Sequence, residues 1–217
     1  MGQYYTALVI DEQSNVARLS PKKFEEFFKL MEHAWIGNSF VNAAYSLIHN
    51  RRRQVAWIGD YSLEDYDPKR DAYAKALPQC QFWKFYHIAW GKLKVASALR
   101  KCDFTQADLD ILMHDTKGMF LLNHSKGLFI DLAGYIKRST DDEGWCANPL
   151  PLLTACGNNR GGGDFRAGIG FEHIGAWAFD WLEYTDQIPE GYNEFQVRFV
   201  EERKMVSLSA YLDSLLA

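Results

Sequence analysis

The chain begins with two short apolar runs separated by a polar one. Residues 4–10 are aromatic, aliphatic or β-branched, which is typical of a β-strand, and Val16–Leu19 can return as a second strand. Asp11–Asn15, between them, consists of residues that favour turns. We therefore expect a β-hairpin at the start of the chain.

Helical spacing of apolar residues follows this hairpin. Ser20–Pro21 can open a helix, with proline at its first position. The expected buried face of that helix consists of Phe24, Phe27, Phe28, Met31, Ala34 and Trp35. Gly37–Asn38 should interrupt the helix, and Ser39 can cap a second one. The buried face of the second helix is expected to contain Val41, Ala44, Tyr45 and Ile48.

The middle of the chain predicts one strand and then a long helical region. Val55–Ile58 is a short apolar run that ends at Gly59–Tyr61, which predicts a strand. Residues 71–115 carry an apolar stripe at helical spacing with most of their basic residues off it, so we expect helices there.

Strand character returns in the second half of the chain. Met119–Asn123 and Leu128–Leu132 flank a turn at residues 125–127 and predict another hairpin. Trp177–Tyr184 suggests a further strand. In residues 195–199, apolar and polar side chains alternate, which predicts a half-buried strand, and residues 208–216 predict a closing helix.

The order hairpin, helical segment, short strand describes residues 1–61 and again residues 118–186. Val55–Tyr61 and Gly175–Asp180 also share Ala-Trp, with an Asp three residues after the Trp. We interpret the chain as a single α+β domain with a mixed or mainly antiparallel sheet. In this interpretation, residues 1–61 and 118–186 are degenerate related halves. Residues 70–115 are a helical insertion, and residues 187–217 a terminal strand and helix.

Composition is that of an ordinary globular protein: 217 residues, 47% hydrophobic and 24% charged. No apolar run approaches about 18 residues, and the first residues lack the pattern of a signal peptide, so we expect a cytoplasmic protein without a membrane span. The four cysteines form no CxxC pair and are interpreted as reduced thiols. The net charge of −4 argues against binding to duplex nucleic acid. Aromatic residues make up 15% of the chain, which indicates either a core anchored by large side chains or an aromatic binding surface.

The strongest local signal is a glycine-rich block at residues 157–164. Contiguous glycines allow several main-chain amides to approach one anion closely. Arg160 could add a bidentate contact to a phosphate, and Asp164 could bind a ribose hydroxyl or a cation. The block matches neither a Walker A loop nor the dinucleotide fingerprint, and a tight corner between two crossing backbones is the competing interpretation. The expected ligand-binding residues are Asn158, Asn159, Arg160, Gly161, Gly162, Gly163, Asp164 and Trp177.

Several segments resemble an uncharacterised family of bacterial and phage-associated proteins. The matching segments are Gly2–Tyr5, Lys29–Glu32, Gly59–Tyr61, Asn158–Asp164 and Ile174–Asp180. Asn159 stands where that family usually has glycine, and residues 70–115 have no counterpart. In the shorter relatives the glycine-rich segment follows the Lys-Leu-x-Glu helix directly, which favours duplication with insertion here. The resemblance indicates site candidates and implies no reaction.

Other candidates for chemistry are isolated. Asp60 and Asp180 follow tryptophan-containing segments and could converge as acid and base, or each could accept backbone donors. His33 and His124 are the histidines of most interest, although a hydrogen-bonded core imidazole is the simpler interpretation. No zinc-type spacing is present, and we expect neither a metal nor a cofactor.

Three functions remain open from the sequence. The first is binding of a small anionic, nucleotide-like ligand through residues 157–164, with a base stacked on the Trp177–Tyr184 segment. The second is a protein–protein module of phage or mobile-element conflict that masks a partner. The third is a hydrolase or transferase that acts on a nucleotide-like substrate through Asp60, Asp164 and Asp180, which requires at least two of these carboxylates around one cleft.

Overall fold

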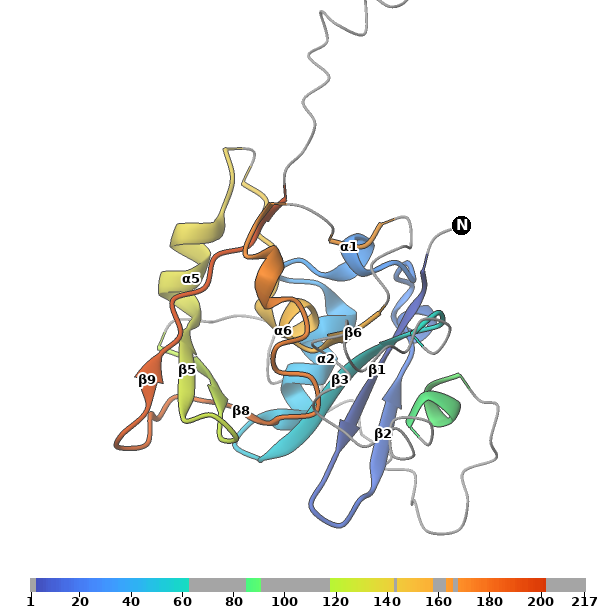
Figure 1. The fold of residues 1–217 in the computed structure, drawn as a ribbon, viewed down its shortest axis with the longest axis horizontal. Helices are drawn as coiled ribbons and strands as arrows, with labels where there is room; N and C mark the ends of the chain where they lie inside the picture. The colour runs from blue at the N-terminus through green and yellow to red at the C-terminus, as the bar shows by residue number, and fades with distance from the viewer. Residues whose placement is uncertain are drawn as a thin grey trace, which may run out of the picture.

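The computed structural model describes residues 3–62, 85–90, 118–142, 144–157, 163–165 and 168–201. Its main strands are β1 (Tyr5–Ile10), β2 (Val16–Leu19), β3 (Arg53–Gly59), β4 (Phe120–Asn123), β5 (Leu128–Asp131), β6 (Ala155–Cys156), β8 (Trp181–Thr185) and β9 (Asn193–Glu194). They form one eight-stranded sheet in the order β2-β1-β3-β8-β4-β5-β9, with β6 beside β3 (Figure 1). Most pairings are antiparallel, so the predicted α+β class with a mainly antiparallel sheet is confirmed.

The helices and a small second sheet complete the described fold. The helices are α1 (Leu30–His33), α2 (Ser39–Ile48), α5 (Leu132–Ser139) and α6 (Pro149–Leu153), with 3-10 turns η1 (Pro21–Phe24) and η2 (Phe171–His173). Strands β7 (Gly168–Ile169) and β10 (Val200–Glu201) pair antiparallel in a separate sheet.

The central sheet has the same strand order read inward from β2 and from β5, and β9 lies outside β5. In the first half, β1 pairs with β2 and then with β3, giving the order β2-β1-β3. In the second half, β4 pairs with β5 and then with β8, giving β5-β4-β8. Strands β3 and β8 pair antiparallel and join the halves. Each half therefore contains a hairpin, at least one helix, and a strand that returns beside the first strand of its hairpin.

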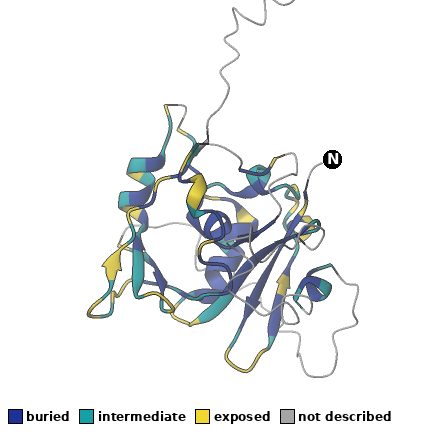
Figure 2. Cartoon of the chain, viewed as in Figure 1, coloured by how far each residue is buried: buried dark blue, intermediate teal, exposed yellow. Residues whose placement is uncertain are grey.

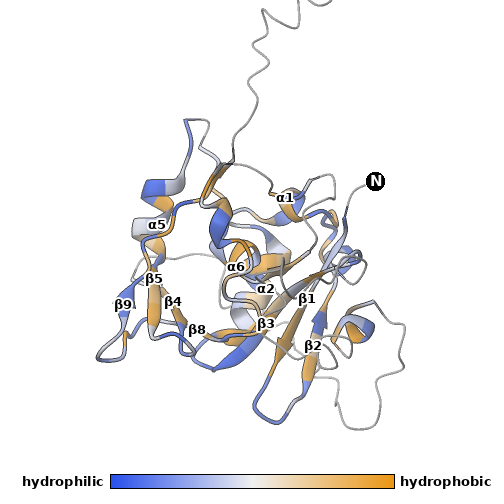
Figure 3. Cartoon of the chain, viewed as in Figure 1, coloured by the Kyte–Doolittle hydropathy of each residue, from blue (hydrophilic) through white to orange (hydrophobic). Residues whose placement is uncertain are grey.

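Both faces of the first half of the sheet are buried, which explains why every residue of β1 is buried and all but Thr6 are aromatic or aliphatic. On one face, Tyr5, Ala7 and Val9 pack in the main core with residues of α2 and α6. On the other face, Leu8 and Ile10 pack with Tyr86, Ile88 and Ala89 of the helical residues 85–89. Figures 2 and 3 show the result: strands β1 to β3 are mostly buried and mostly hydrophobic.

The predicted elements of the first half are mostly confirmed. The strands at 4–10, 16–19 and 55–58 correspond to β1, β2 and β3. The helix expected after Gly37–Asn38 is α2, but Asn38 is its cap, because the Asn38 side chain accepts the N–H of Val41 at 3.2 Å.

The helix expected over residues 21–35 is wrong in extent. Only η1 and the single turn of α1 form, and Glu25 adopts a left-handed φ of 59° between them. The main chain of residues 27 and 28 bonds elsewhere: the Phe28 carbonyl accepts the N–H of Tyr5 at 2.8 Å, and the Phe27 carbonyl contacts Nδ1 of His33 at 3.0 Å. These bonds compete with the hydrogen bonds of a continuous helix.

The second half shows further differences from the sequence-based expectations. The hairpin is confirmed as β4 and β5, and the helical segment expected after it, for which no bounds were predicted, consists of α5 and α6. Residues 177–179 form turns, and β8 begins only at Trp181. In the expected strand at 195–199, Val197 and Phe199 are buried as predicted, but this stretch is irregular and lies between β9 and β10. Most of the predicted helical insertion at 70–115 and all of the closing helix lie outside the described residues.

Candidate functional site

The glycine-rich block begins at a parallel pair of strand ends. Strands β3 and β6 pair in parallel, with Trp57 opposite Ala155 and Ile58 opposite Cys156. Gly59 is the last residue of β3 and Gly157 directly follows β6, so the two glycines lie at the same end of this strand pair. In sheets with parallel strands, ligands typically bind just beyond such carboxyl ends.

The side chains of Gln3, just before β1, and of Tyr5, in β1, fill the space beside these glycines. A Cβ atom on Gly157 would lie 2.2 Å from Oη of Tyr5, and one on Gly59 would lie 2.3 Å from Nε2 of Gln3. The Tyr5 hydroxyl in turn donates to Oε1 of Gln3 at 3.1 Å, and both side chains are buried. Gly59 and Gly157 are therefore needed for close packing, as the crossing-backbone interpretation predicts for the start of the block.

The far end of the block is anchored on α1. Gly163 has a φ of +82°, and a Cβ there would lie 2.7 Å from Cδ of Lys29. The Gly163 carbonyl accepts the N–H of Met31 at 2.9 Å. Asp164, the next residue, is 4% exposed. The remaining predicted ligand residues, Asn158, Asn159, Arg160, Gly161 and Gly162, lie outside the described residues.

A cation lies beside the anchored end of the block. The Lys29 Nζ atom pairs with Oε1 of Glu32 at 3.0 Å, and this hydrogen bond raises the pKa of Lys29. The Glu32 carboxylate also accepts the main-chain N–H of Lys29 at 3.1 Å. Lys29 therefore stays positively charged at neutral pH, next to Gly163.

Asp60 lies at the same edge and accepts a backbone donor. Its Oδ1 accepts the N–H of Tyr4 at 3.0 Å, and its own N–H donates to the Tyr4 carbonyl at 2.9 Å. The Tyr86 hydroxyl donates to the Asp60 carbonyl at 2.6 Å. These bonds fix the start of β1 against the end of β3.

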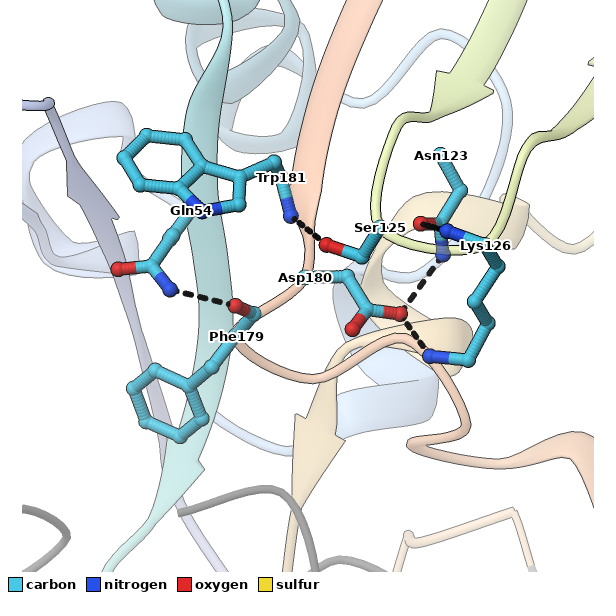
Figure 4. Close-up of polar contacts among 7 residues, drawn as sticks. All are labelled: Gln54, Asn123, Ser125, Lys126, Phe179, Asp180 and Trp181. Carbon is cyan, nitrogen blue, oxygen red and sulfur yellow. Dashed lines mark hydrogen bonds and ion pairs between the residues drawn. The ribbon is translucent and has the colours of Figure 1, made fainter.

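Asp180 lies at a different place, where it holds a turn against the β4–β5 hairpin (Figure 4). Its carboxylate accepts from Nδ2 of Asn123 at 2.7 Å and pairs with Lys126. The neighbouring main-chain N–H of Trp181 donates to Oγ of Ser125 at 2.9 Å. The polar partners of Asp180 described here are thus those of a structural turn.

The structure separates Asp60 from Asp180. The residue before Asp180, Phe179, donates its N–H to the carbonyl of Val55 at 2.8 Å. Asp60 lies five residues farther along the same strand, which corresponds to about 16 Å of extended chain. The two carboxylates therefore do not form an acid–base pair. Of the three candidates, only Asp60 and Asp164 lie where Gln3–Tyr5, Lys29, Gly59, Gly157 and Gly163 meet, which we call the glycine-rich edge.

Trp177 is not placed to stack on a ligand. It is 1% exposed, and its ring packs on Phe195 with centroids 5.3 Å apart. Trp57, its predicted counterpart in the first half, lies inside β3, whereas Trp177 lies in the turns before β8. The shared Ala-Trp therefore marks different positions in the two halves.

A pair of aromatic side chains, the exposed Tyr4 and the half-buried Phe28, lies at the glycine-rich edge instead. The rings of Tyr4 and Phe28 lie 5.6 Å apart, and Tyr4 is 46% exposed. Phe28 is positioned by its carbonyl, which accepts the N–H of Tyr5. Sequence analysis assigned Tyr4 and Phe28 to the interior of a strand and a helix, so it missed them as site residues.

Four of the five segments that carry the family resemblance meet at this edge. Gln3–Tyr5 packs against Gly59–Asp60, Lys29 contacts Gly163, and Gly157 contacts Tyr5. The fifth segment, Ile174–Asp180, bonds to α6 and to the beginning of β3.

Compared with protein-family models, curated proteins and solved structures, the chain has no match. Within the described ranges, no three His, Cys, Asp or Glu side chains are grouped closely enough to hold a metal ion. None of the helices in the described part of the chain is long and apolar enough to cross a membrane. Cys146 and Cys156 are both buried.

The packing at the glycine-rich edge makes a testable prediction. We expect Gly157→Ala to lower the free energy of unfolding by about 1–3 kcal/mol, because the new methyl group would overlap the Tyr5 hydroxyl. Removing that hydroxyl should relieve the overlap, so the double variant Tyr5→Phe/Gly157→Ala should lose less than the sum of the single losses. Urea unfolding of the four proteins measures the coupling.

Tyr45→Phe provides the matched control, because the Tyr45 hydroxyl bonds to Asn148, away from Gly157. Its effect should simply add to that of Gly157→Ala. If the losses from Tyr5→Phe and Gly157→Ala also simply added, the contact between residue 157 and the Tyr5 hydroxyl would be contradicted.

Proposed function

We propose that the chain binds a small anionic, nucleotide-like ligand through the glycine-rich segment 157–164. The observation that carries this proposal is that both ends of the segment are anchored at one edge of the sheet. Gly157 is held against Tyr5 beyond the parallel ends of β3 and β6, and Gly163 is held against Lys29 and Met31. A segment rich in glycine and fixed at both ends can direct main-chain amides at one anion with little loss of entropy on binding.

Side chains at the same edge suit the rest of such a ligand. Arg160 is the residue of the segment that would contact a phosphate bidentately. The ammonium group of Lys29, ion-paired with Glu32, lies beside Gly163, and the exposed ring of Tyr4, packed on Phe28, offers a surface for a base. In this proposal, Tyr4 takes the stacking role that sequence analysis gave to the buried Trp177.

Thermal unfolding with a panel of anions tests the proposal. Inorganic phosphate, pyrophosphate and a set of nucleoside mono-, di- and triphosphates would each be added at saturating concentration. We expect at least one nucleotide to raise the Tm of the wild-type protein by several degrees, because ligand at about 100 times its Kd adds about 2.7 kcal/mol of stability. Arg160→Ala should lose most of this increase.

Two further variants make the result specific. Arg51→Ala removes an equal charge from an exposed position just before β3 begins, and it should leave the increase in Tm unchanged. Tyr4→Ala should weaken binding of nucleotides while leaving binding of pyrophosphate intact. The proposal fails if no anion raises Tm, or if Arg160→Ala and Arg51→Ala respond alike.

A further inference from the structure

A chain of three titratable side chains lies at the other end of β3, on the β4–β8 part of the sheet. Nε2 of His124 lies 2.7 Å from Oε2 of Glu183, and Nδ1 of the same ring lies 2.7 Å from Oη of Tyr192. His124 directly follows β4, and its N–H donates to the carbonyl of Trp181 at 2.8 Å. The rings of His124 and Tyr192 also meet edge to face, with centroids 5.7 Å apart.

The partners fix the position of each proton. The Glu183 carboxylate can only accept a hydrogen bond, so Nε2 of His124 carries a proton and donates to it. Nδ1 of the neutral ring is then an acceptor, and the Tyr192 hydroxyl donates to it. Burial lowers the pKa of His124, the Glu183 hydrogen bond opposes that shift, and the charge of Arg52 reinforces it. The imidazole is therefore neutral at pH 7 and able to take up the phenolic proton.

Of the three side chains, the one that would react is accessible to solvent and the base beside it is nearly buried. The His124 side chain is 6% exposed and that of Glu183 is 19% exposed, whereas Tyr192 is partly accessible to solvent. Catalytic triads have the same order of a nucleophile, a base and a group that orients the base. Here Tyr192, His124 and Glu183 lie in that order, with the tyrosine at the accessible end.

Arg52 places a positive charge beside Glu183 and His124. Arg53 pairs with Leu182 across β3 and β8, which places the preceding Arg52 beside Glu183. Arg52 is exposed, and its charge acts on His124. A guanidinium near the imidazole base suits an anionic electrophile, and phosphoryl oxygens are its preferred partners.

We infer that Tyr192 is a nucleophile for phosphate esters, activated by His124 and oriented through Glu183. The Tyr192 Oη attacks phosphorus, the bond from phosphorus to the leaving oxygen breaks, and the phenolic proton passes to Nδ1 of His124. The resulting imidazolium then protonates the leaving oxygen, so the products are a Tyr192 phosphoester and an alcohol. This site is separate from the glycine-rich edge, and it stands whether or not that edge binds an anion.

Labelling with a fluorophosphonate tests this inference, because attack on its phosphorus expels fluoride and leaves a stable adduct. Peptide mass spectrometry would compare the labelling rate of Tyr192 with that of Tyr4, an exposed tyrosine of the same chain. We expect Tyr192 to react faster by on the order of 10², the usual gain from a positioned base. Labelling of Tyr192 no faster than Tyr4 in the wild-type protein would overturn the inference.

Variants distinguish activation from mere packing. Tyr192→Phe should abolish the adduct, and His124→Ala should reduce the Tyr192 rate to that of Tyr4. Added imidazole should restore part of the rate in His124→Ala, an effect that a purely structural histidine would not give. Glu183→Gln should slow labelling without removing it, and Arg52→Ala should slow it while Arg51→Ala does not. Undiminished labelling in folded His124→Ala would show that His124 only packs against the ring and would refute the relay.

Discussion

Replacing Trp57 with alanine is expected to lower the free energy of unfolding by about 3–5 kcal/mol. Trp57 is completely buried in the middle of β3, and its ring packs on Phe40 of α2 with centroids 5.5 Å apart. Its Nε1–H donates to Nε2 of His33 at 3.1 Å. The substitution would therefore leave a large cavity and also a buried imidazole nitrogen without its donor. Urea denaturation with fluorescence detection measures the loss.

Trp181→Ala is the matched control for this substitution. Trp181 lies at the start of β8 and is only partly buried, so its removal should cost clearly less than that of Trp57. Similar losses for the two variants would mean that Trp57 is not the anchor of the core between β3 and α2.

Acid is expected to destabilise the protein through His33. This side chain is fully buried, and burial lowers its pKa from 6.5 to about 4, with the Phe27 carbonyl opposing the shift. Between these two values the unfolded chain binds a proton that the folded chain does not, so stability falls as the pH decreases through this window. From pH 7 to pH 5 we expect His33 to account for a loss of about 2 kcal/mol.

The measurement is the free energy of unfolding against pH for the wild-type protein and for His33→Asn, which cannot titrate. The variant should show a shallower decrease between pH 7 and pH 5, whatever its stability at pH 7. Parallel curves for the wild type and His33→Asn would contradict the assigned pKa.

Local patterns were sufficient to predict the hairpins and α2. In β1–β2 and β4–β5, the apolar runs and the turn residues between them agree with each other, so the local sequence specifies the structure. The helix expected over 21–35 failed because tertiary contacts outweighed spacing: β1 and His33 take the main-chain carbonyls of residues 28 and 27. Residues 177–179 failed as a strand for a related reason, since they turn to bond with α6 and β3.

The candidate site was predicted only in part. The glycines at 157 and 163 do mark a place where chain segments approach closely, and the pattern of contiguous glycines was the signal for it. The grouping of Gln3, Tyr4, Lys29 and Asp60 around them depends on the register of β1 with β3 and on the parallel pairing of β6. Segments that are far apart in sequence come together there, and the spacing of residues along one chain does not contain that information.

The same limit applies to the carboxylates and the histidines. Asp60 and Asp180 looked equivalent because each follows an Ala-Trp segment by three residues, yet one follows a strand and the other precedes one. His33 is the hydrogen-bonded core imidazole that the simpler interpretation predicted. Nothing in the local sequence around His124 indicated Glu183 or Tyr192 as its partners.

Strands β3 and β8, which join the two halves of the sheet, are paired only at Arg53–Leu182 and Gln54–Trp181. By contrast, β1 and β3 are paired over six positions. A ladder this short has few hydrogen bonds to hold it, and local opening begins where such bonds are few. In hydrogen–deuterium exchange, we expect amides at this seam to exchange before those between β1 and β3, while the parallel pair of β3 and β6 still links the two halves.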